Sequence, residues 1–244
     1  MTNSKKDTLL PETENWLKTR KANEQKLEES GVWNASQEHD ACGVGFVASV
    51  DGSTRRSVVD AAIEALQSIW HRGAVDADGM TGDGAGIHLA IPREFFIKHI
   101  ARTGHEDDGG KLAVGMVFLP RNDLGAQETC RCIVEREILN MGHFIYGWRQ
   151  VPVDITALGE KAMATRPEIE QIMFSMPQDI SEQEAECQLY LIRRRIEKAV
   201  LAELVTDFYI CSLSTRSIIY KGMFLAEQVT CLLYTSPSPR DQSG

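Results

Sequence analysis

The chain has no long hydrophobic run and few basic residues. None of its apolar stretches approaches the roughly 20 residues that a membrane-spanning helix needs. Its 26 Lys and Arg face 35 Asp and Glu, a formal charge of -9, which disfavours nucleic acid or an anionic membrane as a partner. The N-terminal segment lacks the apolar core of a secretory signal and is too acidic for a typical transit peptide. These absences predict a cytoplasmic protein that binds neither nucleic acid nor a membrane.

Cysteine is also scarce, with six residues and no disulfide-like spacing, which fits a reducing compartment. Cys130 and Cys132 are two apart on a predicted helix and so point to different sides. No second cysteine or histidine pair completes a zinc site, and no metal is expected. Cys187, Cys211 and Cys231 are predicted to be small buried apolar residues.

Three regions follow from composition. Residues 1–37 are rich in Lys, Glu, Asn and Thr, with an exposed helix predicted over 18–29. Residues 1–41 then have two open interpretations, a mobile tail or a leader removed before Cys42. Residues 42–231 form the predicted domain. Residues 232–244, with two Ser-Pro steps and no periodicity, predict a disordered or non-native tail.

Strand and helix patterns alternate through the predicted domain. Ser57 with Asp60 predicts the capped start of a helix that ends at His71-Arg72-Gly73, and Ser181 with Glu184 predicts another capped start. The remaining patterns predict strands over 43–50, 85–91, 112–119, 144–153, 168–175, 208–213 and 217–221, and helices over 92–101, 127–141 and 181–204.

Cys42 is the most informative residue. Small residues flank it, a strand-like apolar stretch follows, and the charged leader precedes it. A cysteine at a chain start carries a thiol nucleophile beside a free α-amine. Their ordinary pKa values, about 8.5 and about 7.7–8.0, allow the amine to take the thiol proton near neutral pH. None of the six histidines pairs with a nearby carboxylate to offer another base.

The stretch 71–86 is rich in glycine and aspartate. A phosphate-binding loop is disfavoured, because the Gly-Lys-Ser/Thr signature is missing and the glycines precede a strand. A calcium loop would use Asp76, Asp78 and Asp83, but the terminal Glu of an EF-hand is missing. A tight connection between a helix and a strand remains the simplest structural interpretation.

Three runs together carry a family resemblance: EHDACGVGFVA, HRGAVDADGMTGDGAGI and ICSLSTRSIIYKGM. Over residues 38–228 the chain resembles the amino-terminal glutaminase domain of glutamate synthase large subunits, a class II glutamine amidotransferase with an N-terminal nucleophile. The resemblance implies an α+β fold, a four-layer αββα N-terminal-nucleophile hydrolase sandwich, here incomplete at its C-terminal end. It also implies removal of a propeptide that leaves Cys42 first.

In that family the cysteine attacks the carboxamide of L-glutamine, releases ammonia and leaves a glutamyl thioester that water hydrolyses. The complete enzyme uses the ammonia to form glutamate from 2-oxoglutarate, with FMN and an iron–sulfur cluster. No cofactor is expected in this chain itself. Expected partners are the remaining large-subunit domains and an electron-donor subunit or ferredoxin. The residues expected to support the pocket are Gly43, Arg72, Gly73, Thr81, Gly82, Asp83 and Gly84.

The chain departs from the family after its Tyr-Lys-Gly-Met stretch. The family's Ser-Arg-Phe-Ser-Thr run, its oxyanion-hole Asn-Gly pair and its amine-binding aspartate are not found before residue 244. Losing one oxyanion donor costs on the order of a hundredfold in rate, so this polypeptide alone is expected to be inactive or barely active. The alternative is a non-catalytic domain that keeps the fold for assembly or regulation.

Overall fold

The computed structural model describes residues 18–19, 21–23, 25–26, 28–30, 43–69 and 75–230. The chain divides into two units, Met1–Cys42 and Gly43–Gly244. Cys42, Arg72, Gly73, Cys231 and the 232–244 tail lie outside the described residues, as does the predicted cleavage point before Cys42.

In the first unit, the described residues between 18 and 29 are helical and exposed. Gln25 Nε2 donates to Glu29 Oε1 at 3.1 Å across one turn. This confirms the exposed helix predicted from the leader sequence.

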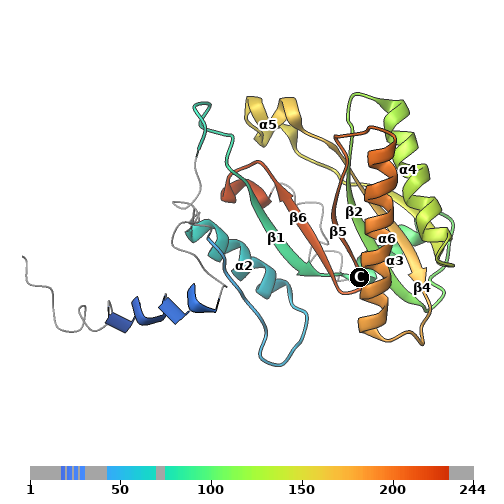
Figure 1. Cartoon of the computed structure of the whole chain (residues 1–244), viewed down its shortest axis with the longest axis horizontal. Coiled ribbons are helices and arrows are strands. Elements are labelled where there is room, and N and C mark those ends of the chain that lie inside the picture. The colour runs from blue at the N-terminus through green and yellow to red at the C-terminus, as the bar shows by residue number, and fades with distance from the viewer. Residues whose placement is uncertain are drawn as a thin grey trace, which may run out of the picture. The chain divides into compact units, whose positions relative to one another are not determined.

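The second unit alternates helices and strands (Figure 1). Its helices are α2 (Arg56–Ser68), α3 (Arg93–Arg102), α4 (Leu124–Leu139), α5 (Glu160–Thr165) and α6 (Glu182–Ala202), with short 3-10 turns η2 (Ile155–Ala157) and η3 (Ala226–Gln228). Its strands are β1 (Ala85–Ala90), β2 (Lys111–Leu119), β3 (Phe144–Gln150), β4 (Glu168–Met176), β5 (Tyr209–Ser214) and β6 (Ser217–Gly222).

These strands form two antiparallel sheets. The larger has the order β3-β4-β2-β5, and the smaller pairs β1 with β6. Strand β2 pairs along its whole length with β4, from Lys111 opposite Met176 to Leu119 opposite Glu168. β5 and β6 follow one another in the chain but belong to different sheets, so the turn between them links the sheets. Antiparallel sheets with helices packed against them are the pattern of an α+β protein.

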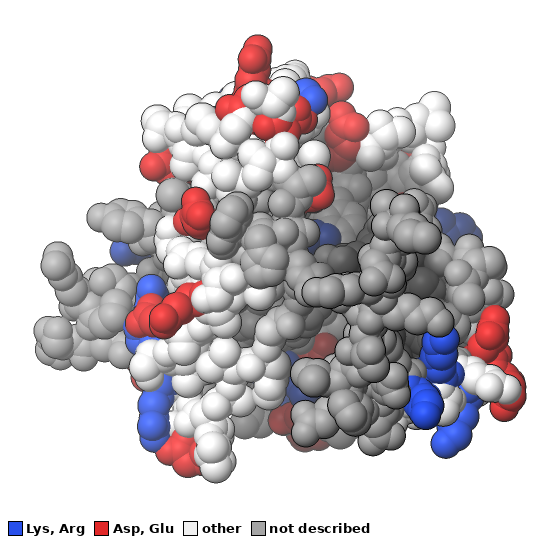
Figure 2. Space-filling model, turned by 90° about the vertical axis from the view of Figure 1, so that its left-hand side faces the viewer, with Lys and Arg blue, Asp and Glu red and all other residues white. Residues whose placement is uncertain are grey.

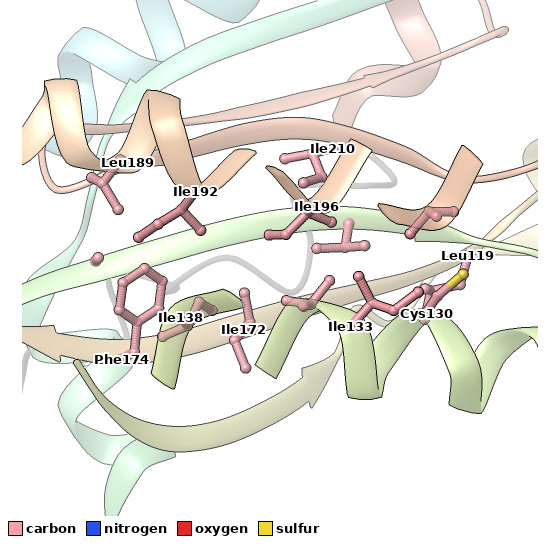
Figure 3. Packing of buried hydrophobic residues seen from close by; sticks show 14 of the residues in the cluster. Leu119, Cys130, Ile133, Ile138, Ile172, Phe174, Leu189, Ile192, Ile196 and Ile210 are labelled. Carbon is pink, nitrogen blue, oxygen red and sulfur yellow. The ribbon is translucent and has the colours of Figure 1, made fainter. Parts of the chain in front are cut away.

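One apolar cluster lies between the larger sheet and helices α4 and α6. Helix α6 directs Leu189, Ile192 and Ile196 toward Ile210 of β5, and α4 contributes Ile133 from the same layer (Figure 3). These five side chains are 4% exposed or less. The two helices therefore cover one face of this sheet.

A second cluster lies between the two sheets. Side chains alternate along β2, so that Val114 and Met116 enter this cluster while Ala113 and Val117 enter the first one. Ile63 of α2 joins it beside the strands β1 and β6. Strand β2 is thus buried on both faces, as its nearly continuous apolar sequence requires.

The polar residues in this second layer form a connected network. Arg149 donates to Gln171 Oε1 at 2.8 Å and to His99 Nε2 at 3.2 Å, and its guanidinium lies 4.9 Å from the Phe95 ring centre. Gln171, which is fully buried, donates to the Tyr220 hydroxyl at 3.3 Å. The network joins α3, β3, β4 and β6 through hydrogen bonds that replace those lost to water.

Most predicted elements are confirmed. β1, β2, β4, β5, β6 and α3 lie within two residues of their predicted bounds, and Ser181 caps α6 by accepting from the Glu184 amide at 3.1 Å. Cys130 is buried and Cys132 exposed, as the helix spacing predicts, and Cys211 is buried.

Other predictions are wrong. Residues 43–50 pair with no strand among the described residues, and Val44 and Phe46 are 90% and 91% exposed. Alternating apolar residues favour a strand, but a strand forms only against a partner edge. Cys187 is exposed rather than buried, because it lies on the outer side of α6.

The helix ends also differ. Ser57 does not cap α2, which begins at Arg56 and ends at Ser68, before the predicted His71-Arg72-Gly73 stop. Asp60 instead pairs with Arg56 at 2.8 Å. Asp123 caps α4 by accepting from the Ala126 amide, so this helix begins three residues before the predicted start. Helix α5 was not predicted, because six residues are too few to show a helical apolar period.

Ile196→Ala tests the cluster under α6. We expect a loss of about 2–5 kcal/mol in the free energy of unfolding, because the removed atoms leave a cavity in a fully buried layer. Leu201→Ala on the same helix is the matched control, since Leu201 is 66% exposed. It should cost less than about 0.5 kcal/mol in denaturant unfolding. Equal losses for both variants would contradict this packing.

His99→Gln tests the interior network by its pH dependence. Burial, with the charges of Arg149 and Arg102, lowers the pKa of His99 to about 4. The unfolded chain then takes up a proton below about pH 6.5 while the folded chain does not, so stability falls between about pH 6.5 and about pH 4. His99→Gln keeps an acceptor for Arg149 but cannot titrate, and should flatten this decline in denaturant midpoints. The same substitution at the exposed His88 is the control, and a decline that His99→Gln leaves unchanged excludes His99 as its source.

Candidate functional site

The predicted site residues fall into two groups. Gly43, Thr81, Gly82, Asp83 and Gly84 are described, whereas Cys42, Arg72 and Gly73 are not. Gly43 is exposed at the head of the unpaired segment 43–50. The four residues from Thr81 to Gly84 lie together in the loop 75–84, which directly precedes β1. Its geometry is the described part of the candidate site.

The loop is closed at its base by the main chain. Val75 and Gly82 form an isolated antiparallel bridge. The Asp76 amide donates to the Thr81 carbonyl at 2.8 Å, and the Gly79 amide donates to the Asp76 carbonyl at 2.9 Å. Two hydrogen bonds within a few residues give this loop a defined shape. That shape fixes the backbone between Val75 and Gly82.

Asp78 organises the inside of the loop. Its carboxylate accepts from the amides of Met80 at 2.9 Å and Thr81 at 2.7 Å, and from the Thr81 hydroxyl at 2.5 Å. These donors, the Thr81 hydroxyl first, hold the pKa of Asp78 well below its ordinary value. Thr81 is 3% exposed. The aspartate is therefore an ionised internal acceptor of the loop.

The start of α5 braces one side of the loop. A Cβ atom at Gly159 would clash with the Thr81 hydroxyl and the Asp78 carboxylate, so only glycine allows this approach. Lys161 forms an ion pair with Asp76. This pairing lowers the pKa of Asp76 and raises that of Lys161. An ion pair and a close backbone approach therefore both join the loop to the start of α5.

The segment after β6 braces the other side. A Cβ atom at Gly82 would lie 2.8 Å from the Phe224 carbonyl oxygen, so the two backbones meet directly there. Gln228 donates to the Met80 carbonyl at 3.2 Å and to the Ala157 carbonyl, and its own oxygen accepts from the Leu225 amide at 2.7 Å. One side chain therefore joins the loop to η2 and η3.

These contacts bear on the ligands that the loop could hold. Asp76 and Asp78 already accept protein donors, which disfavours the calcium-loop interpretation. No group of three or more His, Cys, Asp or Glu side chains could hold a metal ion within the residues that the structure describes. Among the described surface atoms, acidic side chains gather at the upper end of Figure 2, where Figure 1 places α5. An acidic surface disfavours phosphate binding there as well.

An iron–sulfur site has no fit in the described residues. An iron–sulfur cluster needs several cysteine ligands together, but Cys130 and Cys211 are buried in different clusters. Cys132 and Cys187 lie exposed on separate helices. In the described ranges, moreover, no helix combines the length and apolarity needed to cross a bilayer.

The sequence indicates the loop but does not indicate Lys161 and Gln228, the side chains that hold it. Lys161 lies 85 residues from Asp76, and Gln228 lies 148 residues from Met80. No local pattern marks either residue. Gly159 just before α5 was the one available signal, since glycine often marks a close approach of two backbones.

Residues 42–236 match the family described as Glutamine amidotransferases class-II. The chain is 60% identical over 223 residues to the glutamate synthase [NADPH] large chain of Azospirillum brasilense, covering 91% of this chain and 15% of that protein. It is 42% identical over 188 residues to ferredoxin-dependent glutamate synthase 2 of Synechocystis sp., covering 77% of this chain and 12% of that protein. It is 38% identical over 209 residues to glutamate synthase [NADH] of Saccharomyces cerevisiae, covering 82% and 10%.

Gly82→Ala tests the contact between the loop and the segment after β6. The added methyl would meet the Phe224 carbonyl, so we expect the loop to shift and unfolding to become easier by about 1–3 kcal/mol. Gly45→Ala is the control, because a Cβ atom added at Gly45 would lie 3.9 Å from Ala65 Cβ, an ordinary van der Waals contact. Denaturant unfolding of both variants measures the difference. Wild-type stability in Gly82→Ala would show that the two backbones do not meet.

Proposed function

Because the chain belongs to the class II glutamine amidotransferases, we propose that it is the glutaminase domain of a glutamate synthase, with Cys42 as an N-terminal nucleophile. The observation that carries the proposal is the start of the family match. It begins at residue 42, the cysteine that sequence reasoning selected as a future chain start. The relatives named as glutamate synthases support the rest. This chain spans 15% or less of those three proteins, so their whole activity is assigned here by proposal.

The chemistry begins with removal of residues 1–41, which frees the α-amine of Cys42. That amine takes the thiol proton, and the thiolate attacks the side-chain carboxamide carbon of L-glutamine. The resulting oxyanion collapses and breaks the carbon–nitrogen bond. The protonated α-amine of Cys42 gives its proton to the leaving nitrogen, which departs as ammonia. A glutamyl thioester remains on Cys42. Water hydrolyses it to glutamate and restores the thiol.

The loop from Thr81 to Gly84 serves this site as a support. The Asp76 and Asp78 carboxylates of loop 75–84 accept hydrogen bonds from protein donors, so we assign the loop a role through its shape and backbone rather than as an acid or base. Arg72 and Gly73 continue directly into this loop along the sequence and belong to the same proposed pocket, with Gly43 beside the nucleophile. Support of this kind keeps reacting groups aligned, and misalignment by an ångström can cost about a hundredfold in rate.

The fold supports the same proposal. Two packed sheets, with α2 joining the smaller and α4 and α6 covering the larger, support a four-layer αββα N-terminal-nucleophile hydrolase sandwich as the proposed architecture. We assign 1–41 to a propeptide and 42–231 to this domain. In the complete enzyme the ammonia would form glutamate from 2-oxoglutarate, with FMN and an iron–sulfur cluster outside this domain. An electron-donor subunit or ferredoxin completes the set of proposed partners, and the cytoplasm is the proposed compartment.

The printed 244 residues are expected to turn over glutamine slowly by themselves. They contain no Ser-Arg-Phe-Ser-Thr run of the kind expected for binding the substrate carboxylate. The second candidate function, a non-catalytic assembly domain, is favoured by no contact among the residues that the structure describes. Cleavage before Cys42 separates the two, because an assembly role does not need a free amine.

Cys42→Ala in the full-length gene product tests the proposed nucleophile. We expect an electrophilic glutamine analogue to label the wild-type protein at Cys42 and to leave the variant unlabelled, because no other thiol is activated by an α-amine. Cys187→Ala is the matched control, since Cys187 is also an exposed thiol, and it should label like wild type. Mass spectrometry of the labelled peptides gives the answer. Equal labelling of wild type and Cys42→Ala would falsify the assignment.

A further inference from the structure

Gln228 lies where three segments of the second unit meet. Its side-chain amide donates to the Met80 carbonyl at the tip of the loop and to the Ala157 carbonyl of η2. Its side-chain oxygen accepts from the Leu225 amide, where η3 begins. Both ends of the amide therefore have partners, and all of these partners are backbone groups. Such a side chain holds main-chain positions rather than a ligand.

The contact at Met80 reaches the base of the loop. Asp78 binds the amides of Met80 and Thr81, and Thr81 in turn accepts from the Asp76 amide at 2.8 Å. Val75 opposite Gly82 closes the loop one residue further out. A shift at Met80 is therefore passed through a short hydrogen-bonded chain to Val75. Gly82, which pairs with Val75, is one of the residues expected to support the pocket.

The two braces of the loop are not equivalent. The α5 side acts through charges, with Lys161 paired to Asp76 at the loop surface. The Gln228 side acts through neutral hydrogen bonds, and Phe224 next to it is 4% exposed and packed in the cluster between the sheets. Neutral bonds anchored to a packed core are less sensitive to salt than a surface ion pair. Gln228, together with the backbone contact between Gly82 and Phe224, therefore connects the loop to the buried part of the second unit.

We propose that Gln228 is a positioning residue for the glutamine pocket. It holds the loop 75–84 against η2 and η3, and thereby sets the position of the backbone from Thr81 to Gly84, the described part of the proposed pocket. The inference rests on the proposed function, since it needs the pocket to lie at that stretch. Gln228 contacts no reacting atom in this account. Its loss should impair the alignment of glutamine more than the reactivity of the thiol.

Gln228→Glu in the full-length gene product separates the two ends of the amide. The introduced carboxylate still accepts from the Leu225 amide, but it faces the carbonyl oxygens of Met80 and Ala157 without a proton to donate. We expect kcat/KM for glutamine, and labelling of Cys42 by an electrophilic glutamine analogue, to fall about tenfold or more. Labelling by iodoacetamide, which needs no pocket, should stay within about twofold of wild type. Glu227→Gln, on the exposed neighbouring residue, is the control and should leave all rates unchanged.

The pH profile gives a readout that a general loss of stability would not produce. The introduced carboxyl can again donate one hydrogen bond once it is protonated, so the defect relative to wild type should shrink as the pH falls toward its ordinary pKa of about 4.3. An unlabelled wild-type protein would refute the proposed function itself. A labelled wild type with Gln228→Glu at the same rate would refute only the positioning role. Equal losses toward both reagents, with a lowered melting temperature, would reduce Gln228 to a structural residue and also overturn it.

Discussion

The pairing of β2 with β4 and β5 is the constraint on which the rest of the second unit depends. β2 places alternate side chains in both apolar clusters, so it fixes the distance and register between the helix layer and the smaller sheet. β5 runs from this sheet into the turn before β6, and β6 leads to η3. The position of Gln228, and through it that of the glycine-rich loop, therefore follows from the register of the central strands.

The loop shows how a rigid frame can support chemistry that it does not perform. Its acidic side chains look like ligands in the sequence, yet the structure uses Asp76 and Asp78 as acceptors for Lys161 and Thr81. What remains for the site is the shape of the backbone between Thr81 and Gly84. This fits a nucleophile that carries its own base, because such a residue needs alignment more than an additional acid or base.

Much of the fold could be predicted from the sequence, because β2, β4 and α6 have strong apolar patterns and α6 carries a local cap at Ser181. Helix α5 could not, since its position depends on the approach of Gly159 to Thr81. The segment 43–50 shows the converse, a strand-like pattern without a partner edge among the described residues. For the site, Cys42 is proposed from its neighbours in sequence. Gln228 could not be proposed in this way, because two of its three partners lie 71 and 148 residues away.

Mass spectrometry of the full-length gene product, quenched while it consumes glutamine, tests the central claim most directly. The account predicts a mature chain whose first residue is Cys42 and a glutamyl group held on that sulfur as a thioester. Rapid ammonia release by protein that retains residues 1–41, with no acyl group on Cys42, would contradict it.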